Sequence, residues 1–136
     1  MATVQIVNSF KEAVAEKKHD LGADTLKFML TNTAPSLANT VKADLTEITA
    51  GNGYTAGGTA VTVTSSAQSG GTYSLVLAAC TFTASGGTIG PFRYVILYND
   101  TATNDELIGY VDYGTSYTLP DGQPFTITAG TFLTNA

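Results

Sequence analysis

The chain has 136 residues, the usual size of one domain, and is long enough to bury a core without disulfides or metals. Only 12% of the residues are charged and the net charge is −5, with six basic residues spread along the sequence. This balance excludes the usual nucleic-acid-binding surface, which needs clustered lysines and arginines. Surface polarity must come mainly from hydroxyl groups and backbone, which suits threonine-rich strands better than charged helices.

The single cysteine, Cys80, cannot form an intramolecular disulfide. It lies in the apolar run YSLVLAACTF, where we expect a buried hydrophobic residue and not a reactive thiol. The opening MATVQIV lacks the features of a signal peptide, and no stretch approaches the roughly 20 apolar residues that span a membrane. We therefore expect a soluble protein made in a cytoplasm and not associated with a membrane.

The clearest helix signal lies near the N-terminus. Ser9 and Glu12 have the S-x-x-E spacing of a capping box, and the apolar residues that follow fall on one face. We expect the helix to end near His19, where a cation would interact favourably with the helix dipole. The following DLGAD segment is turn-like, and Gly22 is suited to a left-handed conformation.

From Thr25 onward the apolar period changes from 3.6 to two, which predicts a strand with Leu26, Phe28 and Leu30 on one dry face. Residues 33–44 are expected to form a loop with one helical turn.

Beyond Gly58 the pattern is one of strands and turns. We expect strands over residues 61–64, 73–83, 92–98 and 107–113, turns at SAQSGG and ASGG, and a hairpin with Pro120–Gly122 at its tip.

Turn signals at such close intervals predict a mainly β fold, an antiparallel β-sandwich or jelly-roll-like barrel with one short N-terminal helix. We expect a single domain over residues 1–136. It would consist of an N-terminal arm and helix over about 1–20, a β-rich body over about 24–129 and a C-terminal tail over about 130–136. The terminal segments TVQIV and TFLTNA are candidate arms that become ordered only against neighbouring molecules.

The glycine-rich stretch GNGYTAGG over residues 51–58 raises the question of a phosphate-binding loop. Such a loop leads from glycines into a helix and places a lysine after the last glycine. Here Gly57 and Gly58 are followed by Thr59 and a strand pattern, without a lysine. We therefore interpret Gly51, Gly53, Gly57 and Gly58 as structural turn residues and expect no cofactor.

Candidates for catalysis and metal binding are few. His19 is the only histidine and lies sixty residues from Cys80, so a zinc site is not expected. The loop from Asn99 to Glu106 has several oxygen ligands without the spacing of a calcium loop, and whether it binds a cation stays open. Asp105, Glu106 and Asp112 do not form a recognisable acid–base pair. We therefore predict no catalytic residues and no enzymatic activity.

Several longer segments, taken together in order and spacing, carry a resemblance. They are HDLGADTLKFMLTN, EITAGNGYTAGGTAV, IGPFRYVILYNDT, ELIGYVDYG and DGQPFTIT, which together cover roughly residues 10 to 128. The chain resembles small virion structural proteins of tailed bacteriophages. The resemblance implies a capsid decoration (cement) protein or a tail-associated protein, located on the virion and made in the cytoplasm of the host bacterium.

The expected partners are the major capsid protein and neighbouring copies of this chain in a dimer or trimer, with neither nucleic acid nor membrane. Seven tyrosines and the absence of tryptophan suit either core packing or an interface. The candidate contact residues are Tyr54, Arg93, Tyr94, Asp112 and Tyr113, and Arg93 either pairs with Asp112 across the sheet or reaches a partner. The first alternative is a tail or fibre component that binds host glycans, and a more distant one is a small hydrolase or lyase.

Overall fold

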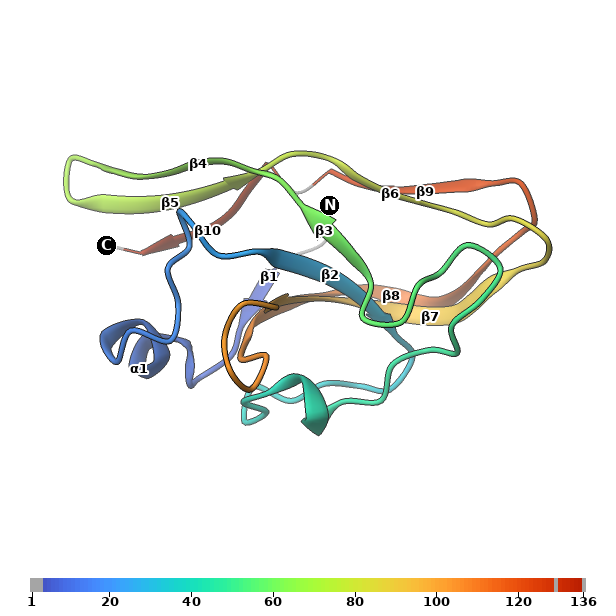
Figure 1. Cartoon of the computed structure of the whole chain (residues 1–136), viewed down its shortest axis with the longest axis horizontal. Coiled ribbons are helices and arrows are strands. Elements are labelled where there is room, and N and C mark those ends of the chain that lie inside the picture. Colours follow the sequence, from blue (N-terminus) through green and yellow to red (C-terminus); the bar gives the residue numbers. More distant parts are fainter. Residues whose placement is uncertain (1–3, 129, 136) are drawn as a thin grey trace.

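Two layers of antiparallel strands make up most of the computed structural model, which describes residues 4–128 and 130–135 (Figure 1). One layer is a five-stranded sheet with the order β1-β8-β7-β2-β3, and the other contains a three-stranded sheet, β10-β5-β4, and a two-stranded sheet, β6-β9. The strands are β1 (Val4–Ile6), β2 (Leu26–Thr31), β3 (Thr59–Val61), β4 (Val63–Ser69), β5 (Thr72–Leu77), β6 (Cys80–Thr83), β7 (Ile89–Asn99), β8 (Leu107–Leu119), β9 (Pro124–Ile127) and β10 (Gly130–Asn135). The predicted mainly β, antiparallel class with a short N-terminal helix is confirmed.

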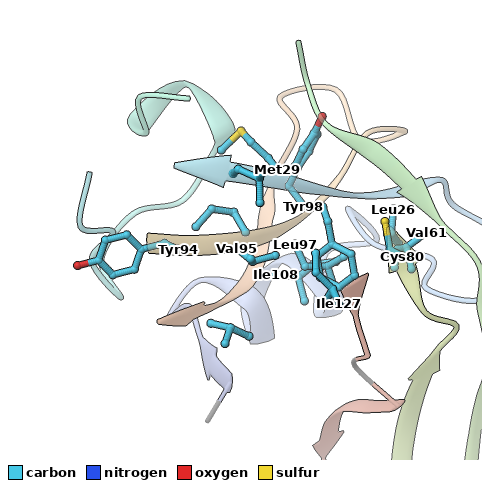
Figure 2. Packing of buried hydrophobic residues seen from close by; sticks show 14 of the residues in the cluster. Leu26, Met29, Val61, Cys80, Tyr94, Val95, Leu97, Tyr98, Ile108 and Ile127 are labelled. Carbon is cyan, nitrogen blue, oxygen red and sulfur yellow. The ribbon is translucent and has the colours of Figure 1, made fainter. Parts of the chain in front are cut away.

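The core lies between the two layers and is built from alternate residues of each strand. In the five-stranded sheet, Phe28 on β2 pairs with Leu97 on β7, so both side chains point to the same face. Phe28 contacts Phe132 of β10 in the opposite layer, with 6.0 Å between the ring centroids. Figure 2 shows part of this core, including Leu97 and Ile127 from the two layers.

The second face of the five-stranded sheet is also covered. Met29 on β2 lies on the face opposite Leu26, Phe28 and Leu30, and it is fully buried. The long loop between β2 and β3 lies over this face, where Ile48 packs against the core and donates its backbone N–H to the carbonyl of Leu30. This loop contains the predicted helical turn, a 3-10 turn at Lys42–Asp44. The prediction of a single dry face was therefore wrong.

The N-terminal helix is shorter than predicted. Helix α1 spans Phe10–Ala15, and the Ser9 side chain makes no capping hydrogen bond. Lys17, and not Gly22, adopts the left-handed conformation, with φ of 65°. Six residues are too few for a helix that propensity alone can stabilise, so the buried side chains Phe10 and Ala13 hold it to the core. In the described part of the chain, no helix is long and apolar enough to cross a membrane.

Four predicted strand and turn assignments differ from the structure. The expected strand over 61–64 is divided between β3 and β4, which belong to different sheets. Of the expected SAQSGG turn, residues 66–69 continue β4 and only Gly70 and Gly71 form the turn. The predicted strand over 73–83 is interrupted at 78–79, where the chain passes from one sheet to another. Pro120–Gly122 does not close a hairpin, since β8 pairs with β7 while β9 pairs with β6. The periodicity of the sequence predicts strands and turns from neighbouring residues, whereas the pairing of strands depends on residues far away in the sequence.

The terminal segments were expected to be arms that need neighbouring molecules for order. In the structure β1 pairs with β8 and β10 pairs with β5, so the described parts of both segments are strands of the chain's own sheets. Both strands also contribute to the core, through Ile6 and through Phe132 and Leu133. Thr3 and Ala136 lie outside the described residues. The prediction was wrong because these short apolar runs find partners within the same chain.

The approach of the glycine segment to β2 predicts a large effect of Gly58→Ala. An added Cβ would lie 1.9 Å from the carbonyl oxygen of Phe28, at a backbone φ of +85°. Gly122 has a similar φ of +81° but open space around it, so Gly122→Ala carries the conformational strain alone. We expect Gly122→Ala to lower the free energy of unfolding by about 1 to 2 kcal/mol and Gly58→Ala by about 4 kcal/mol or more, measured by urea denaturation. If the two variants lose the same free energy of unfolding, the close approach of residue 58 to the Phe28 carbonyl does not contribute to the loss.

Candidate interaction surface

A group of aromatic side chains, some buried and some exposed, lies where β9 passes over the start of β7 and the later part of β8 (Figure 1). We call it the aromatic cleft, and it is lined by Phe92, Tyr113, Thr115, Tyr117 and Phe125 around a shallow cavity of about 270 Å³. Phe92 and Phe125 meet edge to face with 5.0 Å between ring centroids, and Tyr117 contacts both rings. Tyr117 is 45% exposed, the highest value among the exposed large hydrophobic residues of the described chain.

The position of the cleft follows from the unequal lengths of the strands. β8 has 13 residues, but β1 pairs with only its first part, over residues 109–111. The second half of β8 therefore has β7 as its neighbour and extends beyond the five-stranded sheet, where β6 and β9 cover it incompletely (Figure 1). The aromatic residues of this end lie partly in the core and partly in solvent.

An ion pair lies next to the cleft in sequence. The Arg93 guanidinium donates two hydrogen bonds to the Asp112 carboxylate, at 2.7 Å from Nε to Oδ1 and 3.1 Å from Nη2 to Oδ2. Arg93 lowers the pKa of Asp112, and the backbone N–H of Gly114 also donates to this carboxylate. The pair holds β7 and β8 together across the sheet, which is one of the two roles expected for Arg93. Both side chains are 38% exposed, so the pair also belongs to the surface.

The other candidate contact residues divide between surface and core. Tyr113 is half-buried and lines the cleft, whereas Tyr94 is only 8% exposed and packs edge to face on Tyr110. Tyr54 is only 2% exposed, so its expected contact with a partner was wrong. Its hydroxyl instead accepts a hydrogen bond from the Leu30 backbone N–H and donates one to Glu47, which fixes it inside the fold.

Three residues of the cleft were not expected at an interaction surface from the sequence: Phe92, Tyr117 and Phe125. The available signal was that Tyr117 and Phe125 lie on either side of the PDGQ segment, three residues before Pro120 and two residues after Gln123. The segment predicts the tip of a hairpin, which would bring the strands that carry these two rings side by side. They are neighbours in the structure, with 6.2 Å between centroids, although their strands belong to different sheets.

The glycine segment forms two tight turns followed by β3. Gly51 and Tyr54 exchange backbone hydrogen bonds around Asn52 and Gly53, both of which have positive φ. In the second turn, the N–H of Gly57 donates to the Glu47 carboxylate at 2.6 Å. The N–H group that a phosphate would use is therefore occupied by a carboxylate of the same chain.

His19 lies in a buried polar cluster behind helix α1. The Nδ2 group of Asn99 lies 2.7 Å from the Asp24 carboxylate and 3.0 Å from His19 Nδ1, while its Oδ1 accepts two backbone N–H groups from the loop that follows. That oxygen fixes the amide orientation, so Nδ2 donates and His19 Nδ1 accepts. Burial lowers the pKa of His19, against the opposing effects of the Glu106 and Asp24 carboxylates and with a small contribution from Lys18.

This cluster changes two expectations from the sequence. His19 is not a cation at a helix end, because α1 has already ended at Ala15 and the imidazole is buried and stacked on Phe10. The Asn99–Glu106 loop uses the Asn99 oxygen for its own backbone, and Glu106 is buried. Asn99 therefore fixes the loop to the N-terminal segment, through Asp24 and His19.

Other reactive groups are dispersed. Cys80 is buried on β6, and burial raises the pKa of its thiol. In the ranges 4–128 and 130–135, no three His, Cys, Asp or Glu side chains are grouped closely enough to hold a metal ion.

Comparisons with family models, with curated proteins and with solved structures found no match to this chain. The aromatic cleft is therefore the feature on which a function is best built.

The state of His19 predicts how stability depends on pH. Because its pKa is lower in the folded chain than the ordinary 6.5, the unfolded chain takes up the proton first as the pH falls. The stability from neutral His19 should thus be complete above about pH 6.5 and decrease toward the folded pKa. We expect the free energy of unfolding to fall between about pH 7 and 5 in the wild type and to fall less in His19→Asn, which keeps an acceptor near Asn99. Identical slopes in the two proteins would contradict the assignment.

Proposed function

We propose that this chain is a non-enzymatic structural protein of a bacteriophage virion. In this proposal it is a capsid decoration protein that binds the outer surface of the major capsid protein lattice and stabilises the head. The family resemblance of the sequence suggests the setting, and the aromatic cleft is the observation that carries the proposal. The protein would be made in the cytoplasm of the host bacterium and would function on the assembled particle.

The aromatic cleft has the properties of an interface centre. Tyrosine and phenylalanine provide a large contact area at low conformational cost, and tyrosine also offers a hydroxyl to the partner. Phe92 is buried and supports the exposed Tyr117, so a partner would meet a ring already held in place. A preorganised aromatic residue at the edge of a shallow cavity is a typical energetic hot spot of protein interfaces.

The scaffold suits a mechanical role. A decoration protein acts through many modest contacts that the symmetry of the shell repeats, so each contact must have the same geometry in every copy. The cleft lies on the β7–β8 hairpin, which is paired on both sides in the five-stranded sheet over residues 94–99 of β7 and 109–111 of β8. The Arg93–Asp112 pair further restrains the two strands beside the cleft.

The alternative of a tail or fibre component uses the same surface. An aromatic cleft of about 270 Å³ with the hydroxyl groups of Thr115 and two tyrosines is also suited to a sugar ring of a host glycan. The two functions predict different partners for the same residues. An experiment that offers both partners to one set of variants therefore separates them.

The test is binding of the purified protein to empty capsids, compared with binding to host cells. We expect Tyr117→Ser to weaken capsid binding by about tenfold or more, because it removes the exposed ring. Val14→Ser is the matched control, since Val14 is the other large exposed hydrophobic residue among those that the structure describes, at 41%. Thr115→Arg adds a bulky charge at the cleft while keeping every aromatic ring, so it should also weaken binding without loss of core packing.

Capsid binding that both cleft variants, Tyr117→Ser and Thr115→Arg, retain at the level of the Val14→Ser control would contradict the role of the cleft. Binding to host cells without binding to capsids, lost in Tyr117→Ser, would replace decoration with the receptor-binding alternative. Thermal unfolding of each variant, compared with the wild type, separates loss of binding from loss of folding.

A further inference from the structure

We infer that the free edge of β4 pairs with the β4 edge of a second copy of this chain. The two three-stranded sheets would then form one continuous six-stranded antiparallel sheet across a twofold axis. The inference concerns self-association in solution and does not rest on the proposed function.

The first observation is an open sheet edge. β4 is the last strand in the order β10-β5-β4, so one side of its backbone has no strand partner within the described residues. Figure 1 shows β4 along the top of the molecule, in the hairpin that projects from the body. Five of its seven residues are exposed, the exceptions being Val63 and Ser66. Such an edge is a template for pairing with another strand.

The second observation is that β4 lacks the usual protection. Natural edges are blocked by charges, by proline, by bulges or by short length. β1 and β3 have three residues each, β9 carries Pro124, and β10 lies beside β1. β4 has seven residues with neither a charge nor a proline, and its register irregularity, between Val63 and Ser65, lies at its start. Residues 65–69 are therefore a regular, open edge.

The turn after β4 shows which backbone groups face outward. Gly70 and Gly71 both have positive φ, so β4 and β5 are joined by a two-residue turn of the I′ type. The flanking pair, Ser69 and Thr72, is hydrogen-bonded in such a hairpin, and bonded pairs alternate along the strands. The N–H and C=O groups of Ser66 and Gln68 therefore point away from β5 and toward the open edge.

These two residues define a self-complementary register. An antiparallel second copy places Ser66 opposite Gln68 of that copy and the reverse, which allows about four backbone hydrogen bonds. Ala67 then meets its own counterpart at the twofold axis, where a methyl group is small enough for close approach. A twofold axis repeats the same surface on both partners, so a strand of small uncharged residues is suited to it.

Charge explains why a second copy fits this edge. Each copy carries a net charge of −5, so two copies repel, and the repulsion is smallest where the surfaces that meet carry no charge. The sequence has no charged residue from Ile48 to Phe92, and β4 lies in the middle of this segment. Like charges directly opposite each other destabilise a strand pair, and β4 has none to place there.

The experiment compares Ala67→Lys with Ala15→Lys, both at exposed alanines, by analytical ultracentrifugation over a wide range of protein concentration. We expect the wild type and Ala15→Lys to form a concentration-dependent dimer. We expect Ala67→Lys to raise the dimer dissociation constant by about tenfold or more, because it places two ammonium groups at the axis. Ala15 lies on α1, so its variant carries the same added charge away from the edge.

Cross-linking tests the register. Residues in a non-hydrogen-bonded antiparallel pair have Cα atoms about 4.5 Å apart, within the range of a disulfide. Ala67→Cys should therefore form a covalent dimer on oxidation, whereas two Ser69→Cys chains would have their Cα atoms about 14 Å apart along the strands. Cys80 is buried, so the wild type serves as the uncross-linked control.

Three results would overturn the inference. They are a monomer at every concentration, a dimer that Ala67→Lys leaves unchanged, and cross-linking through Ser69→Cys without cross-linking through Ala67→Cys. Loss of capsid binding in Tyr117→Ser with an intact dimer, or the reverse in Ala67→Lys, would show that the two surfaces act separately.

Discussion

The burial of β7 on both faces is the constraint on which the rest of the structure depends. From Tyr94 to Asn99 every side chain of this strand is buried, so the fold must supply a cover on each side. One cover is the layer formed by β4, β5, β10, β6 and β9, and the other is the long loop between β2 and β3 (Figure 1). Glu47 fixes that loop by accepting hydrogen bonds from the Tyr54 hydroxyl and the Gly57 N–H, and Tyr98 on β7 donates to the Gly57 carbonyl. The glycine segment is thus part of the cover.

The same hairpin produces the surface on which a function is built. β7 and β8 are longer than the strands that cover them, so their central part is enclosed and their far end is only partly covered. Aromatic residues complete the core at that end and expose their edges at the same time. An interface made in this way needs no additional element, because its support is the core itself. Such an interface suits a protein with few charged residues, because its contacts with a partner must come from aromatic rings, hydroxyl groups and backbone.

Sequence reasoning succeeded where local periodicity decides the outcome. It found β2, β7, the 3-10 turn and the antiparallel β class, and it gave an ion pair with Asp112 as one of two roles for Arg93. It failed where the structure depends on contacts between residues that are far apart in the sequence. The break at 78–79 exists because β5 and β6 pair with strands from different parts of the chain, and Tyr54 is buried because Leu30 and Glu47 satisfy its hydroxyl. The capping box failed because tertiary packing, and not local hydrogen bonding, holds the short helix α1.

The distribution of charge connects the two proposed surfaces. Apart from Arg93 and Asp112, which neutralise each other, neither the aromatic cleft nor the β4 edge contains a charged side chain. Association through either surface would therefore depend on ring packing and backbone hydrogen bonds, which salt screens weakly, while the repulsion between negative copies is screened strongly. Added salt should then favour β4 self-pairing, because it removes the opposing term and leaves the attractive one. A contact built on ion pairs would respond in the opposite direction, so the sign of the salt dependence reports which kind of surface has formed.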